Sequence, residues 1–88
     1  MRVPRSIYSP EHRHLVELLR EHREKAGVRQ AELAARLDRP QSFVSKYESG
    51  QRRLDLIEVR QICTALDIDV VNLVRAWERS IRTTKHDK

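Results

Sequence analysis

Eighty-eight residues are enough for one small domain, and a net charge of +5 favours a polyanionic partner. The single cysteine excludes an intrachain disulfide and fits a reducing cytoplasm, while the lack of a long apolar run excludes a membrane span. No metal-ligand spacing, cofactor-binding glycine loop or nucleophile–base pair is visible, so neither an enzyme nor a small-molecule substrate is expected.

The charge is divided along the chain. Residues 29–53 carry six basic and three acidic side chains, whereas residues 55–73 carry one basic and four acidic side chains. A basic face opposite an acidic face is typical of a protein that presents one side to a polyanion.

The N-terminal region contains an arm and then a helix. Residues 1–8 are expected to form a flexible arm, in which Arg2 and Arg5 either reach the polyanion or remain solvated. Ser9 as the N-cap and Pro10 at the first helical position predict a helix over 10–26. Gly27 is expected to end this helix, and the domain that begins here is expected to span 9–82.

Two short helices joined by a tight turn are predicted over residues 30–37 and 41–48. Asp38, Arg39 and Pro40 form the turn, because Asp tolerates the left-handed conformation and Pro suits a helix start. Val44 and Tyr47 share the buried face of the second helix. Its polar residues then point away from the core, and the Tyr47 hydroxyl needs a partner if it is buried.

Two further helices complete an all-α, five-helix architecture. Asp55 and Glu58 form a capping box that opens a helix ending near Asp67, with Cys63 on its buried stripe. Asp69 caps a last helix over 70–82, which leaves 83–88 as a flexible polar tail.

The central motif resembles a known family. Gln30, Ala34, the turn at 38–40, Val44, Glu48 and Gly50 resemble the helix-turn-helix of the lambda-repressor-like (Xre) DNA-binding domains. The resemblance covers about residues 15–75. It implies a five-helix lambda-repressor-like fold whose helix at 41–48 enters the major groove of double-stranded DNA.

The resemblance also implies which residues contact DNA. Base contacts are expected from Gln41, Ser42 and Lys46, and phosphate contacts from Gln30, Ser45, Gln51, Arg52 and Arg53. Arg23 and Glu48 match an ion pair between the first and third helices. Phe43 either tucks against the core or touches a thymine methyl or a sugar.

The last helix carries an unbroken apolar stripe of Val70, Leu73, Val74, Trp77 and Ile81. Leu73 is expected to cover the core, and Trp77, Ile81 and Val74 are expected to form a homodimer interface with Trp77 at its centre. The alternative is that Trp77 and Ile81 pack on the first helix near Leu15 in the same subunit.

Together these features predict a sequence-specific DNA-binding transcriptional regulator, a repressor, acting as a homodimer on a palindromic operator. The alternative is a protein-interaction module of the same fold, such as an antitoxin-like or coactivator subunit. The polar outer face of 41–48, with Arg52 and Arg53 beside it, favours DNA, because protein interfaces have more apolar centres.

Overall fold

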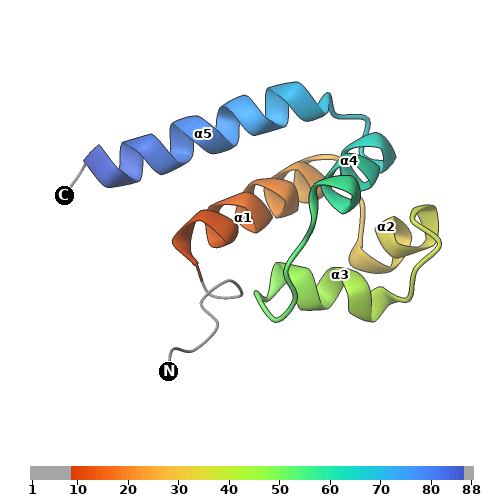
Figure 1. Ribbon diagram of the computed structural model, residues 1–88. Coiled ribbons are helices and arrows are strands. Elements are labelled where there is room, and N and C mark those ends of the chain that lie inside the picture. The colour runs from red at the N-terminus through yellow and green to blue at the C-terminus, as the bar shows by residue number, and fades with distance from the viewer. Residues whose placement is uncertain (1–8, 87–88) are drawn as a thin grey trace.

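A computed structural model describes residues 9–86, which form five helices and no strand. They are α1 (Pro10–Lys25), α2 (Gln30–Arg36), α3 (Gln41–Glu48), α4 (Leu56–Ala65) and α5 (Val70–His86) (Figure 1). The predicted all-α, five-helix fold with a helix-turn-helix at α2 and α3 is confirmed. The expected arm at 1–8 and the last two residues lie outside the described part of the chain.

Side-chain caps begin three of the helices. The Ser9 hydroxyl accepts a hydrogen bond from the His12 N–H at 3.1 Å at the start of α1. At the start of α4, Asp55 Oδ1 accepts from the Glu58 N–H at 2.7 Å, and Glu58 Oε1 accepts from the Asp55 N–H at 3.0 Å. Asp69 Oδ1 accepts from the Val71 N–H at 2.8 Å in α5. These bonds satisfy amide groups that a helix leaves unpaired at its N-terminus.

Two aspartates adopt the left-handed conformation that ends a helix. Asp38 has a φ of 58° after α2, and Asp67 has a φ of 62° after α4. Asp tolerates this region better than most residues with a Cβ atom, so both turns form without glycine. Pro40 follows as the N-cap of α3 with extended backbone.

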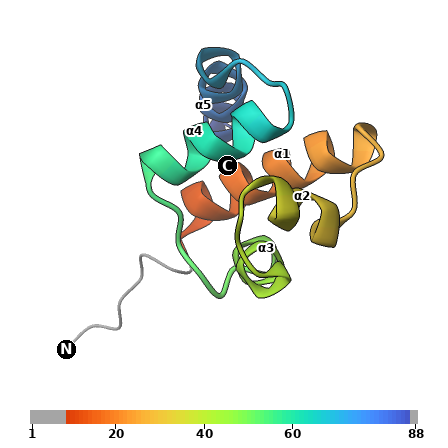
Figure 2. The same ribbon diagram turned by 90° about the vertical axis from the view of Figure 1, so that its right-hand side faces the viewer.

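Helix α1 runs through the middle of the fold, with α3 on one side and α5 on the other (Figures 1 and 2). Leu19 of α1, Leu33 of α2 and Ile62 of α4 are fully buried in one core. Leu73 of α5 is 1% exposed, which confirms its predicted role in covering that core. Cys63 is buried among the same residues, as predicted. The two surfaces of the molecule formed by α3 and α5 are therefore separated by α1.

Helix α5 is longer than its apolar stripe predicts. The sequence predicts an end near Arg82 and a flexible tail from residue 83, but the helix continues to His86. No Gly or Pro interrupts residues 83–86, so no backbone signal stops the helix there. Ser80 Oγ lies 2.9 Å from His14 Nδ1, which ties the middle of α5 to α1. The last turns of α5 extend beyond the start of α1 (Figure 1).

Candidate nucleic-acid interface

Helix α3 presents a polar face to solvent and an apolar face to the core. Gln41, Ser42 and Lys46 are exposed, whereas Val44 and Tyr47 are fully buried. The division follows from the helical period, which places residues three and four apart on one face. The three residues expected to contact bases therefore lie on the outer surface of one eight-residue helix.

A bidentate ion pair holds the C-terminal end of α3 to α1. The Nε and Nη2 atoms of Arg23 donate to the two carboxylate oxygens of Glu48 at 2.7 and 3.0 Å. Arg23 Nη1 donates to the Val28 carbonyl at 2.8 Å, and the Glu48 side chain is only 3% exposed. Hydrogen bonding to Glu48 raises the pKa of Arg23, so its guanidinium remains charged. The ion pair that the resemblance implies is present and sheltered.

Two amide side chains connect this pair to the first residue of α3. Gln30 Nε2 donates to Glu48 Oε1 at 2.9 Å, and Gln41 Nε2 donates to Gln30 Oε1 at 3.4 Å. Gln30, expected at a phosphate, therefore also orients Gln41. Among the described residues, the amide oxygen of Gln41 has no hydrogen-bond partner.

Arg52 does not extend freely from the loop after α3. Its Nη1 and Nη2 atoms donate to Glu58 Oε1 and Oε2 at 3.0 and 2.9 Å, and Nη1 also donates to the Arg53 carbonyl at 2.9 Å. Arg39 Nη2 reaches the same Glu58 Oε2 at 3.4 Å. Both guanidinium carbons lie over the Phe43 ring, at 4.2 Å for Arg39 and 4.8 Å for Arg52.

Sequence reasoning missed Arg39 and the second role of Glu58. The sequence predicts Arg39 only as a turn residue, and it predicts Glu58 only as the capping-box partner of Asp55. The bond to Arg52 lowers the pKa of Glu58, so its carboxylate stays ionised between two guanidinium groups. The sequence offers one clue, which is that several arginines lie near a single acidic residue of α4. This clue does not show which arginine contacts the carboxylate.

The remaining residues expected at phosphates lie beside α3. Gln51 and Arg53 are exposed in the loop, and Ser45 is half-buried, with its hydroxyl donating to the Ser42 carbonyl at 3.3 Å. Arg53 has no ion-pair partner among the described residues. Arg53 is therefore the loop cation that can contact a phosphate without breaking an existing ion pair.

The aromatic residues of α3 both lie in the core. Phe43 is 7% exposed, and its ring packs edge-on against Tyr47 with centroids 5.5 Å apart. Burial at this level favours the core position that was one of the two alternatives for Phe43. The Tyr47 hydroxyl is buried without a hydrogen-bond partner among the described residues. Desolvation raises its pKa, so the hydroxyl remains neutral.

Trp77 packs on α1 within its own subunit. Its indole Nε1 donates to the Glu11 carbonyl at 2.8 Å, and the ring is half-buried. This contact matches the intramolecular alternative for Trp77, and its place in a dimer interface stays a prediction. Val74 remains 37% exposed on the adjacent turn, and Ile81 is half-buried.

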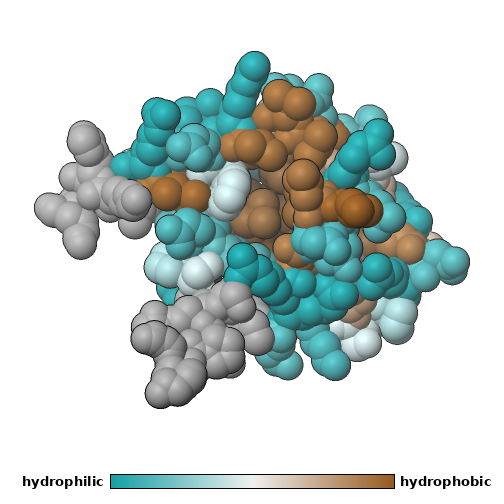
Figure 3. All heavy atoms as spheres, in the orientation of Figure 1, coloured by the Kyte–Doolittle hydropathy of each residue, from teal (hydrophilic) through white to brown (hydrophobic). Residues whose placement is uncertain are grey.

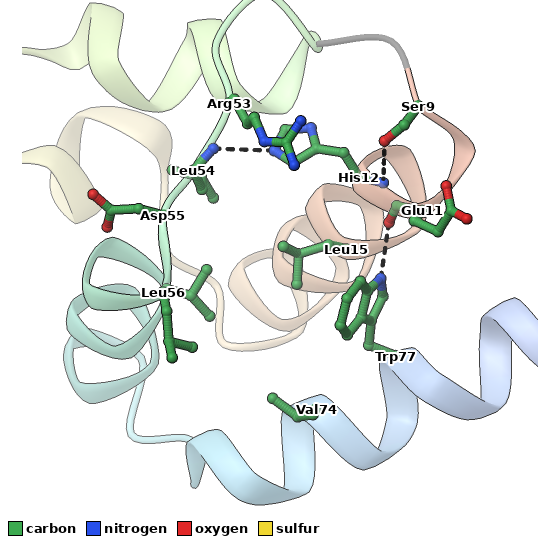
Figure 4. Close-up of a pocket in the computed structure, with 11 residues that line it drawn as sticks. Ser9, Glu11, His12, Leu15, Arg53, Leu54, Asp55, Leu56, Val74 and Trp77 are labelled. Atoms are coloured by element: carbon green, nitrogen blue, oxygen red, sulfur yellow. Dashed lines mark hydrogen bonds between the residues drawn. The ribbon is translucent and has the colours of Figure 1, made fainter. Parts of the chain in front are cut away.

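A groove of about 470 Å³ opens between α1, α4 and α5 (Figure 4). Its apolar lining residues are Leu15, Leu54, Leu56, Val59, Val74 and Trp77. Hydrophobic side chains gather over α4 and the adjoining part of α5 in Figure 3. Leu56, the first residue of α4, is 71% exposed. Helices α4 and α5, which supply Leu56, Val59, Val74 and Trp77 to the groove, lie across α1 from α3 (Figures 1 and 2).

His12 joins the groove to the loop after α3. It is 5% exposed, and its Nε2 accepts a hydrogen bond from the Leu54 N–H at 3.1 Å (Figure 4). Burial, and then the positive charge of Arg53, lower the pKa of His12. The neutral imidazole is the form that can accept this bond, so the loop is held by an uncharged histidine.

Residues 9–86 contain no group of His, Cys, Asp or Glu side chains arranged to hold a metal ion. Within the same residues, no helix has the length and apolar character needed to cross a membrane.

Comparisons with known proteins agree with this geometry. A family model described as a helix-turn-helix domain matches residues 14–77. No curated protein is a significant match to the chain.

Several solved structures share this fold, among them the following three. An XRE-family like protein from Pseudomonas syringae pv. tomato str. DC3000 is 45% identical, with a TM-score of 0.79 over 86% of this chain and 93% of that one. The restriction-modification controller protein C.AhdI from Aeromonas hydrophila is 32% identical, with a TM-score of 0.68 over 74% of this chain and 98% of that one. The clp gene regulator ClgR from Corynebacterium glutamicum is 22% identical, with a TM-score of 0.76 over 90% and 86%, a likeness of fold alone.

Proposed function

Because the chain belongs to the XRE-like family of helix-turn-helix proteins, we propose that it is a sequence-specific, DNA-binding transcriptional regulator of the cytoplasm, acting as a repressor. Helix α3 enters the major groove of double-stranded DNA. One observation carries the proposal: Gln41, Ser42 and Lys46 form an exposed polar face on a helix whose C-terminal end is anchored to α1 through Glu48.

Gln41 is the principal base-reading residue in this proposal. Its Nε2 donates to Gln30, and its amide oxygen remains available to accept from the N6 group of adenine while a second Nε2 hydrogen reaches N7. Lys46, one turn later on the same face, prefers the O6 and N7 acceptors of guanine. Ser42 contacts either a base or a phosphate and discriminates less.

Phosphate contacts position α3 without reading sequence. Arg53 and Gln51, both exposed in the loop after α3, approach one side of the backbone, and Gln30 with Ser45 approaches it from α2 and α3. Arg52 contributes as part of the group that includes Glu58. The basic charge of residues 29–53 supports this assignment, since it lies on the elements nearest α3.

A homodimer on a palindromic operator gives the specificity that one recognition helix lacks, with half-sites about 34 Å apart. Val74 and Ile81 of α5, with the outer edge of Trp77, provide the subunit contact in this proposal. The nearby exposure of Leu56 and Ile57 supports an apolar contact at this side of the fold.

The same apolar surface keeps a second function open, that of a protein-interaction module such as an antitoxin-like or coactivator subunit. An apolar surface of this kind is typical of protein contacts. It lies away from α3, however, and leaves the polar face of α3 unexplained. A protein partner is therefore compatible with DNA binding and does not replace it.

Selection of bound sequences from a random duplex pool tests the function directly. The wild type is expected to enrich one motif, and Gln41→Ala is expected to lose preference at a single position of it. A wild type that enriches no motif while remaining folded contradicts the proposal and favours the interaction module.

A further inference from the structure

Two arginines and one glutamate form a compact group over the ring of Phe43. Arg39 comes from the turn before α3, Arg52 from the loop after it, and Glu58 from α4. The two Nη2 atoms lie 3.4 and 2.9 Å from the same oxygen, Glu58 Oε2. Three different segments of the chain thus hold two guanidinium groups at one place.

The group carries more positive charge than its internal pairing uses. One carboxylate faces two guanidinium groups, which leaves a formal charge of +1. The Glu58 side chain is 11% exposed, whereas the side chains of Arg39 and Arg52 are 36% and 37% exposed. Among the described residues, the Nε and Nη1 atoms of Arg39 and the Nε atom of Arg52 have no hydrogen-bond partner. The outer side of the group therefore offers charged donors to solvent.

The location relative to α3 determines which anion this group fits. Phe43 is the third residue of α3, and Lys46 lies one turn beyond it. Arg39 precedes α3 with only Pro40 between them. When the outer face of α3 lies in a major groove, donors on its flank meet the sugar–phosphate backbone at the groove edge.

We propose that Arg39 and Arg52 together bind one backbone phosphate of the DNA, and that Glu58 is the positioning residue that holds them as a pair. The inference rests on the proposed function and adds Arg39 and Glu58 to it. Guanidinium groups match phosphate oxygens through two parallel N–H bonds. Their restraint by Glu58 and Phe43 reduces the side-chain freedom lost on binding.

The salt dependence of DNA affinity distinguishes a phosphate contact from a purely structural group. Binding of the duplex enriched from the random pool, and of a scrambled duplex, is measured from about 50 to 200 mM salt. Arg39→Gln is expected to lower the slope of log affinity against log salt by about one unit on both duplexes. The ratio of the wild-type affinity to the Arg39→Gln affinity is therefore expected to fall about three- to fourfold as the salt concentration rises across this range.

Arg36→Gln is the matched control. Arg36 is also half-exposed, donates to the Ala65 carbonyl at 3.0 Å and pairs with Glu32 at 4.0 Å, but it faces the end of α4. Its slope is expected to equal that of the wild type. A folded Arg39→Gln protein with the wild-type slope overturns the phosphate contact, whatever its affinity.

Glu58→Gln tests the positioning role separately. Removing a negative charge from a DNA-binding surface tightens binding if charge alone matters. We expect weaker binding instead, because the two guanidinium groups lose the oxygen that orients them. Tighter or unchanged binding by folded Glu58→Gln overturns its role.

The behaviour of the wild type shows whether a negative result concerns the phosphate contact or the proposed DNA-binding function. A wild type that selects no sequence overturns the proposed function. A wild type that selects a motif, with Arg39→Gln unchanged in slope, overturns the phosphate group alone.

Discussion

Removal of the Glu48 carboxylate is expected to be among the most destabilising single changes on α3. Glu48 accepts hydrogen bonds from Arg23 Nε, Arg23 Nη2 and Gln30 Nε2, and its side chain is 3% exposed. Glu48→Ala leaves the Arg23 guanidinium in a sheltered site with one hydrogen-bond acceptor, the Val28 carbonyl. The Glu24 carboxylate lies 3.9 Å away, but it is 53% exposed and therefore screened by solvent. An unpaired charge of this kind costs about 3 kcal/mol, which in a domain of this size lowers Tm by about 12–24 °C.

Urea unfolding followed by circular dichroism measures this loss, and the chain supplies its own control. Glu78 pairs with Arg82 at 3.3 Å, but the two side chains are 55% and 72% exposed. Glu78→Ala is expected to change the free energy of unfolding by less than about 0.5 kcal/mol, because solvent screens such a pair. A Glu48→Ala protein as stable as Glu78→Ala would refute the argument from burial.

A double replacement tests the origin of the penalty. Arg23→Met combined with Glu48→Leu removes both charges and fills similar volume. We expect this protein to recover most of the stability lost in Glu48→Ala, since the cost comes from one charge left without its partner. A double variant less stable than Glu48→Ala would show that the pair itself contributes a large net attraction.

Four further outcomes follow from individual residues. Tyr47→Phe is expected to raise the free energy of unfolding by about 1 kcal/mol, because it removes a buried hydroxyl without a hydrogen-bond partner among the described residues; a loss of stability in urea titrations would reveal an unseen partner. The pKa of His12 lies below its ordinary value of 6.5, so the stability that neutral His12 contributes is complete above pH 6.5 and declines as pH falls through the folded pKa. His12→Gln is expected to remove this decline from the pH dependence of the urea midpoint, and a variant with the wild-type pH profile would contradict the prediction. Gln41→Ala is expected to weaken binding to the selected duplex by about 1–3 kcal/mol while leaving the scrambled duplex unaffected, as measured by fluorescence anisotropy. Sedimentation at micromolar concentration is expected to show a wild-type dimer that Val74→Glu converts to monomer, and a monomeric wild type would refute self-association in the absence of DNA.

The helix boundaries were predictable because their signals are local. Ser9, the Asp55–Glu58 pair and Asp69 each bond to an amide within three residues of themselves, so sequence spacing alone identifies them. The end of α5 was not predictable in this way, because no residue near Arg82 stops a helix. Local rules therefore specify where helices begin more reliably than where a polar helix ends.

The parts of the site that the sequence left open or missed depend on which partner a long side chain contacts in the folded protein. Arg52 can extend to solvent or fold back, and the conformation of the loop between α3 and α4 determines which, by placing Arg52 beside Glu58 and over Phe43. Trp77 similarly lies against the Glu11 carbonyl, 66 residues away in the chain. No periodicity in the sequence distinguishes these alternatives, since each leaves the residue on the same face of its element.

The position of α1 between α3 and α5 has an evolutionary consequence. The proposed base-reading residues Gln41, Ser42 and Lys46 do not line the apolar groove, and of the residues proposed to contact DNA only Arg53 does. Substitutions at two such separated sites generally contribute additively. The target sequence can therefore diverge through Gln41 and its neighbours while the α5 surface is retained, and the α5 surface can acquire new partners while the target sequence is retained. This fold thus allows its two surfaces to evolve as independent modules.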